Sequence, residues 1–321
     1  MHLRRPLLLA LAALALVSSA ASAQCPAYLL KWGAQGTGFG LFRFPQGPSL
    51  APNSEVYVAD SQNNRIQRFT PSGTFISAFG TLGAGNANFN LPVATDIDQG
   101  TGHVYVADQQ NNRIKKHTAT GTFVTAWAVN FPSDVAVDPV TGDVIVTELL
   151  SNLVKRFSSA GAFQFSWGGT GIGNGQFRNP SGVTVDPSGD IYVTDQANNR
   201  VQKFTPGGVF MLKWGTPGAG NGQFSRPVQP AYDGAGGVYV SDPGNHRIQL
   251  FTTGGVFMCS IGSLGVGDGQ FNTPFGVAAS SSSFGVHLVV ADRVNHRMQH
   301  FGDLATPAPS ITWGRLKTLY H

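Results

Sequence analysis

The chain has 321 residues, of which 41% are hydrophobic and 12% charged, enough to bury the core of one large domain. Its formal net charge of +4 is small for this length, so composition gives no electrostatic basis for binding nucleic acid. Gly (41 residues) and Pro (19 residues) recur in register with the rest of the sequence, which indicates turns and not disorder.

The first 23 residues have the pattern of a secretory signal peptide. Arg4 and Arg5 precede an apolar run at 7–17 that is too short to span a membrane, and small residues at 21–23 form a cleavage site. Cleavage after Ala23 leaves 19 basic and 17 acidic residues, a net charge of +2. We therefore expect a soluble chain that is exported to the periplasm or beyond the cell, with no transmembrane segment.

Two cysteines, Cys25 and Cys259, remain in the exported chain. An even count in an oxidising compartment favours a disulfide, although two thiols could also stay free. A lipid anchor at Cys25 is disfavoured, because Gln24 precedes it where that processing requires a small residue.

One block of two short segments recurs six times along the chain. The first segment ends in an acidic residue, a three-residue loop follows, and the second segment is rich in basic and apolar residues. The copies are 56–60 with 64–69, 104–108 with 112–117, 144–148 with 152–157, 191–195 with 199–204, 238–242 with 246–251, and 288–292 with 296–301. The repeat period is 40 to 50 residues.

Both segments alternate in hydrophobicity and are rich in Val, Ile, Tyr and Phe, as β-strands are. One more strand precedes the block, as at 183–186, and another follows it, as at 209–214. Four antiparallel strands per repeat predict an all-β fold, a six-bladed β-propeller whose radial closure protects the sheet edges.

The repeats resemble the NHL family. The resemblance rests on Asn-Asn-Arg-Ile, Asn-His-Arg-Ile and Asn-His-Arg-Met after the acidic strand, and on Gly-(Asn/Asp)-Gly-Gln-Phe-x-x-Pro at 173–180, 220–227 and 267–274. It covers about residues 28–301, so we place the propeller domain at 24–301. Kelch and Gly-His…Trp-Asp patterns are absent from the sequence.

The repeat begins out of phase. Residues 28–33 nearly copy 210–215, an outermost strand, whereas the last repeat ends at Phe301 after its third strand. We expect the N-terminal strand to complete the last blade and close the ring, and a Cys25–Cys259 bridge would tie it to the neighbouring blade. Residues 302–321 lie outside the ring, either as a frayed terminus or as a sorting or anchoring signal.

Five repeats pair an aspartate with an arginine five residues later. The two flank the hairpin loop and can meet across it, which indicates a structural ion pair, since a catalytic group is needed once and not five times. The weaker alternative is a ring of arginines that attracts anions. The pairs are Asp60 and Arg65, Asp108 and Arg113, Asp195 and Arg200, Asp242 and Arg247, and Asp292 and Arg297.

The third repeat departs from this pattern. Glu148 replaces the aspartate, Leu153 replaces the arginine, and Asp134 begins an inner strand where other repeats carry mostly Gly or Ala. Strand pairing about a turn near residue 141 predicts that Asp134 and Glu148 lie close together on one face. Such a pair could bind Ca²⁺ or a basic group, although two solvated acids in a degenerate repeat explain it as well.

The remaining chemistry is sparse. His246 and His296 take one loop position, and His103 and His287 begin equivalent strands, so they lie around a ring and predict no metal site. No Gly-x-Ser-x-Gly, His-Glu-x-x-His or phosphate-loop motif is present, so we assign no catalytic residue and no cofactor.

The function expected from these features is a binding scaffold for protein, peptide or glycan through the loops of one face, and not an enzyme. The alternative is a metal-dependent enzyme, because propellers that resemble this one include lyases and lactonases. RNA-binding NHL propellers are a poorer model, since export and near-neutral charge conflict with that role. The sequence does not indicate an oligomeric state.

Overall fold

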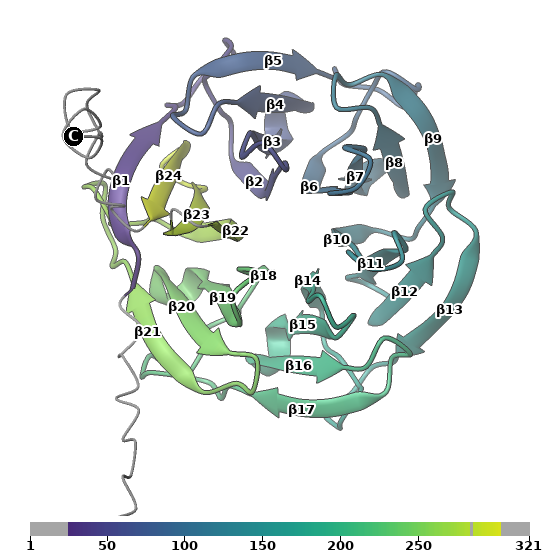
Figure 1. Cartoon of the computed structure of the whole chain (residues 1–321), viewed down its shortest axis with the longest axis vertical. Helices are drawn as coiled ribbons and strands as arrows, with labels where there is room; N and C mark the ends of the chain where they lie inside the picture. The colour runs from purple at the N-terminus through teal and green to yellow at the C-terminus, as the bar shows by residue number, and fades with distance from the viewer. Residues whose placement is uncertain (1–24, 283–284, 303–321) are drawn as a thin grey trace, which may run out of the picture.

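The computed structural model describes residues 25–282 and 285–302. The expected signal segment, and the expected tail beyond Gly302, lie outside these ranges. Within them the strands form a ring around a central axis, with strands β2, β6, β10, β14, β18 and β22 innermost (Figure 1). Four one-turn 3-10 helices, η1–η4, lie between strands, and no helix in the described ranges is long and apolar enough to cross a membrane.

Four sheets have four antiparallel strands each. From the axis outwards, the first three are β10 (Pro132–Val137), β11 (Val144–Glu148), β12 (Leu153–Phe157) and β13 (Phe163–Gly168); β14 (Pro180–Val185), β15 (Ile191–Asp195), β16 (Arg200–Phe204) and β17 (Phe210–Trp214); β18 (Pro230–Tyr232), β19 (Gly237–Asp242), β20 (Arg247–Thr252) and β21 (Phe257–Ile261). The fourth is β22 (Pro274–Ser282), β23 (Gly285–Asp292), β24 (Arg297–Gly302) and β1 (Ala27–Trp32).

The other eight strands form one continuous sheet, which corrects the expectation of a six-bladed propeller with six separate sheets. Four separate four-stranded blades are found, and β2 joins β6 through a parallel pair between Gly47 and Ala94. The physical reason is Gly47, because a Cβ there would lie 2.4 Å from the Ala94 Cα. The sheet runs β5 (Phe75–Phe79), β4 (Arg65–Phe69), β3 (Val56–Asp60), β2 (Pro45–Leu50), β6 (Pro92–Ile97), β7 (Val104–Asp108), β8 (Arg113–His117) and β9 (Phe123–Ala128).

The N-terminal strand closes the ring as expected. Strand β1 lies outside β24 and pairs with it antiparallel, from Ala27 opposite Gly302 to Trp32 opposite Met298 (Figure 1). The Tyr28 and Phe301 rings pack edge to face, with centroids 5.9 Å apart. Because β1 pairs with β24, strand β24 has a hydrogen-bonded neighbour on both sides and does not end the sheet as an unpaired edge.

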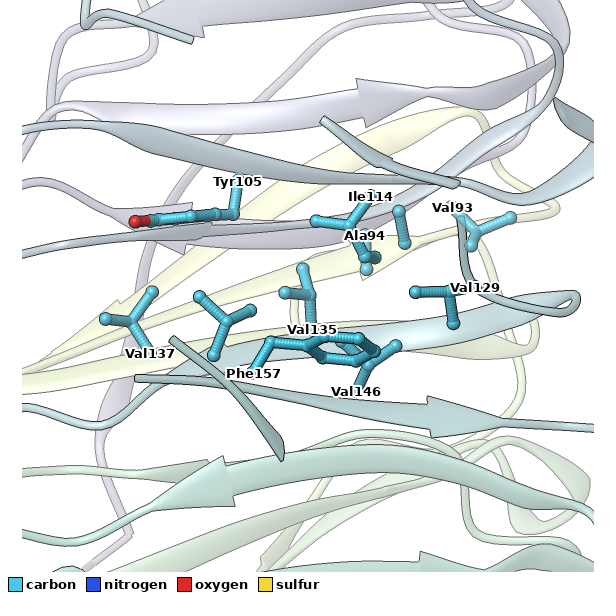
Figure 2. Packing of buried hydrophobic residues seen from close by; sticks show 11 residues of the cluster. Val93, Ala94, Tyr105, Ile114, Val129, Val135, Val137, Val146 and Phe157 are labelled. Carbon is cyan, nitrogen blue, oxygen red and sulfur yellow. The ribbon is translucent and has the colours of Figure 1, made fainter. Parts of the chain in front are cut away.

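Apolar side chains fill the spaces between neighbouring sheets. Figure 2 shows one such cluster, in which Ile114 and its neighbours from β6–β8 face Val135, Val146 and Phe157 from β10–β12. The buried side chains of this cluster are at most 9% exposed. Each buried large apolar side chain contributes about 1.5–3 kcal/mol, so the interfaces between sheets carry most of the stability.

A recurring hydrogen bond also joins each repeat to the next. The residue directly before the third strand of each repeat is left-handed, as at Asn64 with φ 54°, and its side chain accepts the backbone N–H of a left-handed residue that precedes the next inner strand. Four repeats use Asn as acceptor and two use His. The donor and acceptor pairs are Leu91–Asn64, Phe131–Asn112, Asn179–Asn152, Arg226–Asn199, Thr273–His246 and Phe44–His296.

Candidate functional site

The central channel has a narrow waist near one end of the inner strands. Equivalent positions on these strands surround the axis there, and most of them are small because the backbones approach closely: a Cβ on Gly182 would lie 2.2 Å from the Val228 carbonyl oxygen. The buried side chains of Asp134 and Gln229 fill the axis, and Gln229 Nε2 donates to Asp134 Oδ1 at 3.3 Å. The positions are Gly47, Ala94, Asp134, Gly182, Gln229 and Gly276.

Beyond the waist the channel widens into a cavity of about 430 Å³. The inner strands form its wall, and the loops that follow them carry Pro52, Pro139 and Pro187 at its rim. The one-turn helices lie at the opposite end of the strands, because Asp60, which precedes η1, pairs with Pro45 at the start of β2. The cavity therefore lies toward the end of the inner strands opposite the one-turn helices.

Asp96 on β6 is a charged side chain in the cavity wall. The corresponding wall positions hold small side chains, such as Ala136 on β10 and Thr184 on β14. Asp96 Oδ2 accepts the Val137 backbone N–H at 2.7 Å, which fixes the carboxyl against the neighbouring strand. Burial raises the pKa of Asp96 to about 6, although this hydrogen bond opposes the shift.

Asp233 follows β18 at the rim of the same cavity. It is 5% exposed, and its Oδ1 accepts the backbone N–H groups of Ala235 at 2.7 Å and Gly237 at 2.9 Å. Tyr232 lies beside it in the cavity lining. Burial, followed by the Asp233 charge, raises the pKa of the Tyr232 hydroxyl, so this ring stays neutral.

Turn aspartates at the same place in other repeats have basic partners. Asp138 lies 2.8 Å from Arg156 Nη2, and Asp186 lies 3.8 Å from Lys203 Nζ. In the fifth repeat the corresponding position on β20 is Leu250, opposite Tyr239. No ion pair to Asp233 is found among the described residues, and comparison of the repeats in register would have revealed this missing base.

The expected carboxylate pair at Asp134 and Glu148 is wrong. A β-bulge places Pro132 opposite Glu148 but Asp134 opposite Thr147, so the two acids point to different surroundings. Asp134 turns toward the axis, where its Oδ2 accepts the Val183 N–H at 2.9 Å. Burial raises its pKa well above the usual range.

Glu148 is neither solvated nor without a cation. Its Oε1 lies 2.7 Å from Lys155 Nζ and accepts the Asn130 N–H at 2.8 Å, while Oε2 accepts the Ser151 hydroxyl at 2.5 Å. Lys155 thus takes over the charge role of the missing arginine. These contacts give no basis for a Ca²⁺ site shared by Glu148 and Asp134.

The five Asp–Arg pairs lie at the end of the strands away from the cavity. Arg65 Nε donates to Asp60 Oδ2 at 2.7 Å, and its other nitrogens donate to the carbonyl oxygens of Thr37, Gly38 and Leu41. Each arginine therefore anchors its Gly-rich loop. Because the arginines are paired, they do not form a ring of free positive charge that would attract anions. The same pairs have N–O distances of 2.7–2.9 Å at Asp108–Arg113, Asp195–Arg200, Asp242–Arg247 and Asp292–Arg297.

The histidines and cysteines have structural surroundings. His287 Nδ1 lies 3.2 Å from His300 Nε2, whereas His103 contacts Thr101 in a turn. Within the described ranges no group of three or more His, Cys, Asp or Glu side chains could hold a metal ion. Cys25 and Cys259 form a disulfide that ties the chain before β1 to β21 of the adjacent sheet.

Comparison with known proteins agrees with the repeat and the fold. Residues 177–204 match the NHL repeat. This segment spans the loop before β14 through β16, so one repeat of the ring matches the NHL repeat. None of the curated proteins matches the sequence significantly.

Three solved structures share this fold at low sequence identity. Virginiamycin B lyase from Staphylococcus aureus has 15% identity and a TM-score of 0.55 over 79% of each chain. A gluconolactonase from Xanthomonas campestris has 12% identity and a TM-score of 0.62 over 86% of this chain and 96% of its own. An auxiliary nutrient binding protein from Bacteroides ovatus has 14% identity and a TM-score of 0.60 over 80% of this chain and 68% of its own.

These neighbours correct the expectation that the chain is not an enzyme. A lyase and a gluconolactonase are among the solved structures that share this architecture, so the absence of those motifs does not exclude an activity. At 12–15% identity the likeness shows the fold alone, so it establishes no activity for this chain.

Proposed function

We propose that this NHL-repeat propeller is a binding module that takes part of a peptide or glycan into its axial cavity. The observation that carries the proposal is the 430 Å³ cavity on the ring axis, which lies within the size range of ligand sites. Its wall combines apolar side chains with convergent polar groups, as ligand sites do. A cavity of this size suits the end or one side chain of a larger partner.

The rest of the molecule supports a rigid receptor. The cavity wall consists of inner strands that are held by the repeat-to-repeat hydrogen bonds and by the closed ring, so little entropy is lost on binding. The disulfide between Cys25 and Cys259 is consistent with work in an oxidising compartment, and we propose a periplasmic or extracellular location. Detection of the oxidised chain in the periplasm or medium, and of none in the cytoplasm, would test that location.

The experiment compares two bulky substitutions, one near the end of β14 and one in the loop before its start. Thr184→Trp places an indole in the cavity lining, whereas Arg178→Trp changes an exposed residue at the opposite end. Probes are an oligosaccharide array and a displayed library of short peptides, with residues 24–321 as the receptor. Affinity for any hit should fall by about tenfold or more in Thr184→Trp and stay unchanged in Arg178→Trp.

Melting curves show that each variant is folded before binding is compared. If a folded Thr184→Trp variant binds every hit as the parent does, the cavity is not the binding site and the proposal is wrong.

A second candidate function is an enzyme of the lyase or lactonase kind, favoured by Asp96. A wall carboxyl whose pKa is about 6 can exchange a proton near neutral pH, which is the property a general acid or base needs. Asp96→Asn should then abolish turnover of a bound ligand but leave its binding within a few fold. If the parent protein binds a ligand but never converts it, the enzyme candidate is rejected and the binding module remains.

A further inference from the structure

The lining of the cavity is one-sided in charge. It contains the carboxyl groups of Asp96 and Asp233 but no Lys, Arg or His side chain. The whole chain, by contrast, has 21 basic and 17 acidic residues. The cavity is thus an acidic region of a slightly basic protein, and its low-dielectric walls strengthen the field of each carboxylate.

Nothing in the described structure neutralises these two acids. Asp96 accepts a backbone N–H, and Asp233 Oδ1 accepts two, but neither forms an ion pair. At Asp233 the cause is Leu250, which occupies the position of the base that pairs with Asp138 or Asp186 in other repeats. A buried carboxylate without a cation is costly unless something else balances it.

The two carboxyls lie on opposite walls, because β6 and β18 face one another across the axis (Figure 1). Asp233 is at the rim beside Tyr232, a neutral aromatic side chain in the cavity lining, and aromatic rings attract cations. Val135 and Val183 line the wall between the two sides. Acidic oxygen, aromatic ring and apolar wall together form the surroundings that protein sites use for organic cations.

We propose that the cavity binds an organic cation, a protonated amine or guanidinium carried on an apolar body, with the charge at Asp233 and Tyr232. Asp96 adds attraction from the opposite wall. The inference rests on the proposed binding function and narrows it, since it favours a basic peptide over a neutral glycan or an anion.

The test uses two probes of nearly equal shape, phenethylamine and the neutral 2-phenylethanol, with binding followed by titration calorimetry and ligand-observed NMR. The receptors are the parent chain and the Asp233→Asn and Asp96→Asn variants. Asp143→Asn is the matched control, since Asp143 lies on the same face but pairs with Arg156 at 2.9 Å and does not line the cavity.

The amine should bind at least about tenfold more tightly than the alcohol. Asp233→Asn should remove most of that preference, Asp96→Asn should reduce it about threefold, and Asp143→Asn should leave it unchanged. Asn keeps an acceptor for the turn N–H groups, so the variants should stay folded.

Equal binding of both probes, no binding of the amine up to its solubility limit, or a preference that survives Asp233→Asn would overturn the inference. The binding function is judged separately by Thr184→Trp. If that variant loses a peptide or glycan that the Asn variants still bind, the cavity is the binding site and only its cation preference is wrong.

Discussion

The backbone N–H of Phe44 donates to Nδ1 of His296 at 3.1 Å. This bond joins the last repeat to the first and so completes the circle of hydrogen bonds between repeats. Four other repeats use an Asn side chain at this position, which accepts at any pH. His296 accepts only while Nδ1 is unprotonated, so ring closure depends on its protonation state.

His296→Asn should make the domain less sensitive to acid. Burial, followed by the charges of Arg43 and Arg293, lowers the pKa of His296 below its usual value, and Asp60 opposes the shift. Because the folded state disfavours the proton, the stabilisation is complete above the unfolded pKa of about 6.5 and is lost as pH falls below it. Denaturant unfolding measures the free energy of unfolding at pH 7.5 and at pH 5. The decrease between these two pH values should be about 1 kcal/mol smaller in the variant than in the parent.

His103→Asn is the control for this comparison, because His103 lies in a turn and joins no repeats. If the free energy of unfolding decreases equally between pH 7.5 and pH 5 in the parent and in His296→Asn, the hydrogen bond to Phe44 does not respond to pH.

His117→Phe should remove a second acid-sensitive group and raise stability at low pH. His117 is 1% exposed, its ring packs against Phe79, Phe89 and Phe123, and other repeats carry Phe at its position. Burial lowers its pKa to about 4, although a hydrogen bond to Gly121 opposes the shift. Stability that is complete above pH 6.5 is therefore lost between about 6.5 and 4, by up to about 3 kcal/mol.

Thermal melts of His117→Phe between pH 7.5 and 4 would measure this loss. The variant should be the more stable protein at pH 4.5, and a variant that melts below the parent there would contradict the assignment.

Deletion of residues 24–33 should destabilise the domain more than reduction of the disulfide does. The Cys25–Cys259 bridge closes a loop with a sequence separation of 234 residues, for which chain entropy alone gives about 5 kcal/mol. Deletion removes the bridge and also the β1 pairing with β24. Calorimetry of the oxidised, reduced and shortened chains should show melting temperatures falling in that order, and an unchanged value after deletion would rule out the closing strand.

The sequence was sufficient for the strands, for ring closure by β1 and for the position of the Asp–Arg pairs, because each of these follows from a repeated local pattern. It was not sufficient for the parallel pair between Gly47 and Ala94, which merges two expected blades into one sheet. That pair depends on how closely two backbones approach at the axis, and no local pattern encodes that distance.

The site was less predictable than the fold. A single bulge at Ser133 separates Asp134 from Glu148 and turns Asp134 toward the axis, and strand alternation alone gives the wrong face. Asp96 is part of no sequence motif. It stands out as a charged side chain in the cavity only because the five other inner strands have small residues at the corresponding position. Asp233 was detectable in principle, since Leu250 interrupts a series of basic residues in register.

Gly182→Ala should cost about 2 kcal/mol of stability, because an added Cβ would lie 2.2 Å from the Val228 carbonyl oxygen and 2.6 Å from Pro230 at the waist. Gly207→Ala is the matched control, since Gly207 is exposed and its nearest neighbour would be 3.9 Å away. Denaturant midpoints at neutral pH measure both. Equal effects of the two substitutions would mean that the inner strands can move apart at the waist without cost.

Binding of a cationic ligand in the cavity should strengthen as pH rises through about 6. Burial raises the pKa of the Asp96 carboxyl to about 6, so below this pH the carboxyl is largely neutral and its attraction for a cation is lost. Phenethylamine stays protonated throughout this range, so a change in its affinity between pH 5 and 7.5 reports on the protein. In Asp96→Asn the affinity should not vary with pH in this way, and an undiminished pH dependence in that variant would assign the titration to another group.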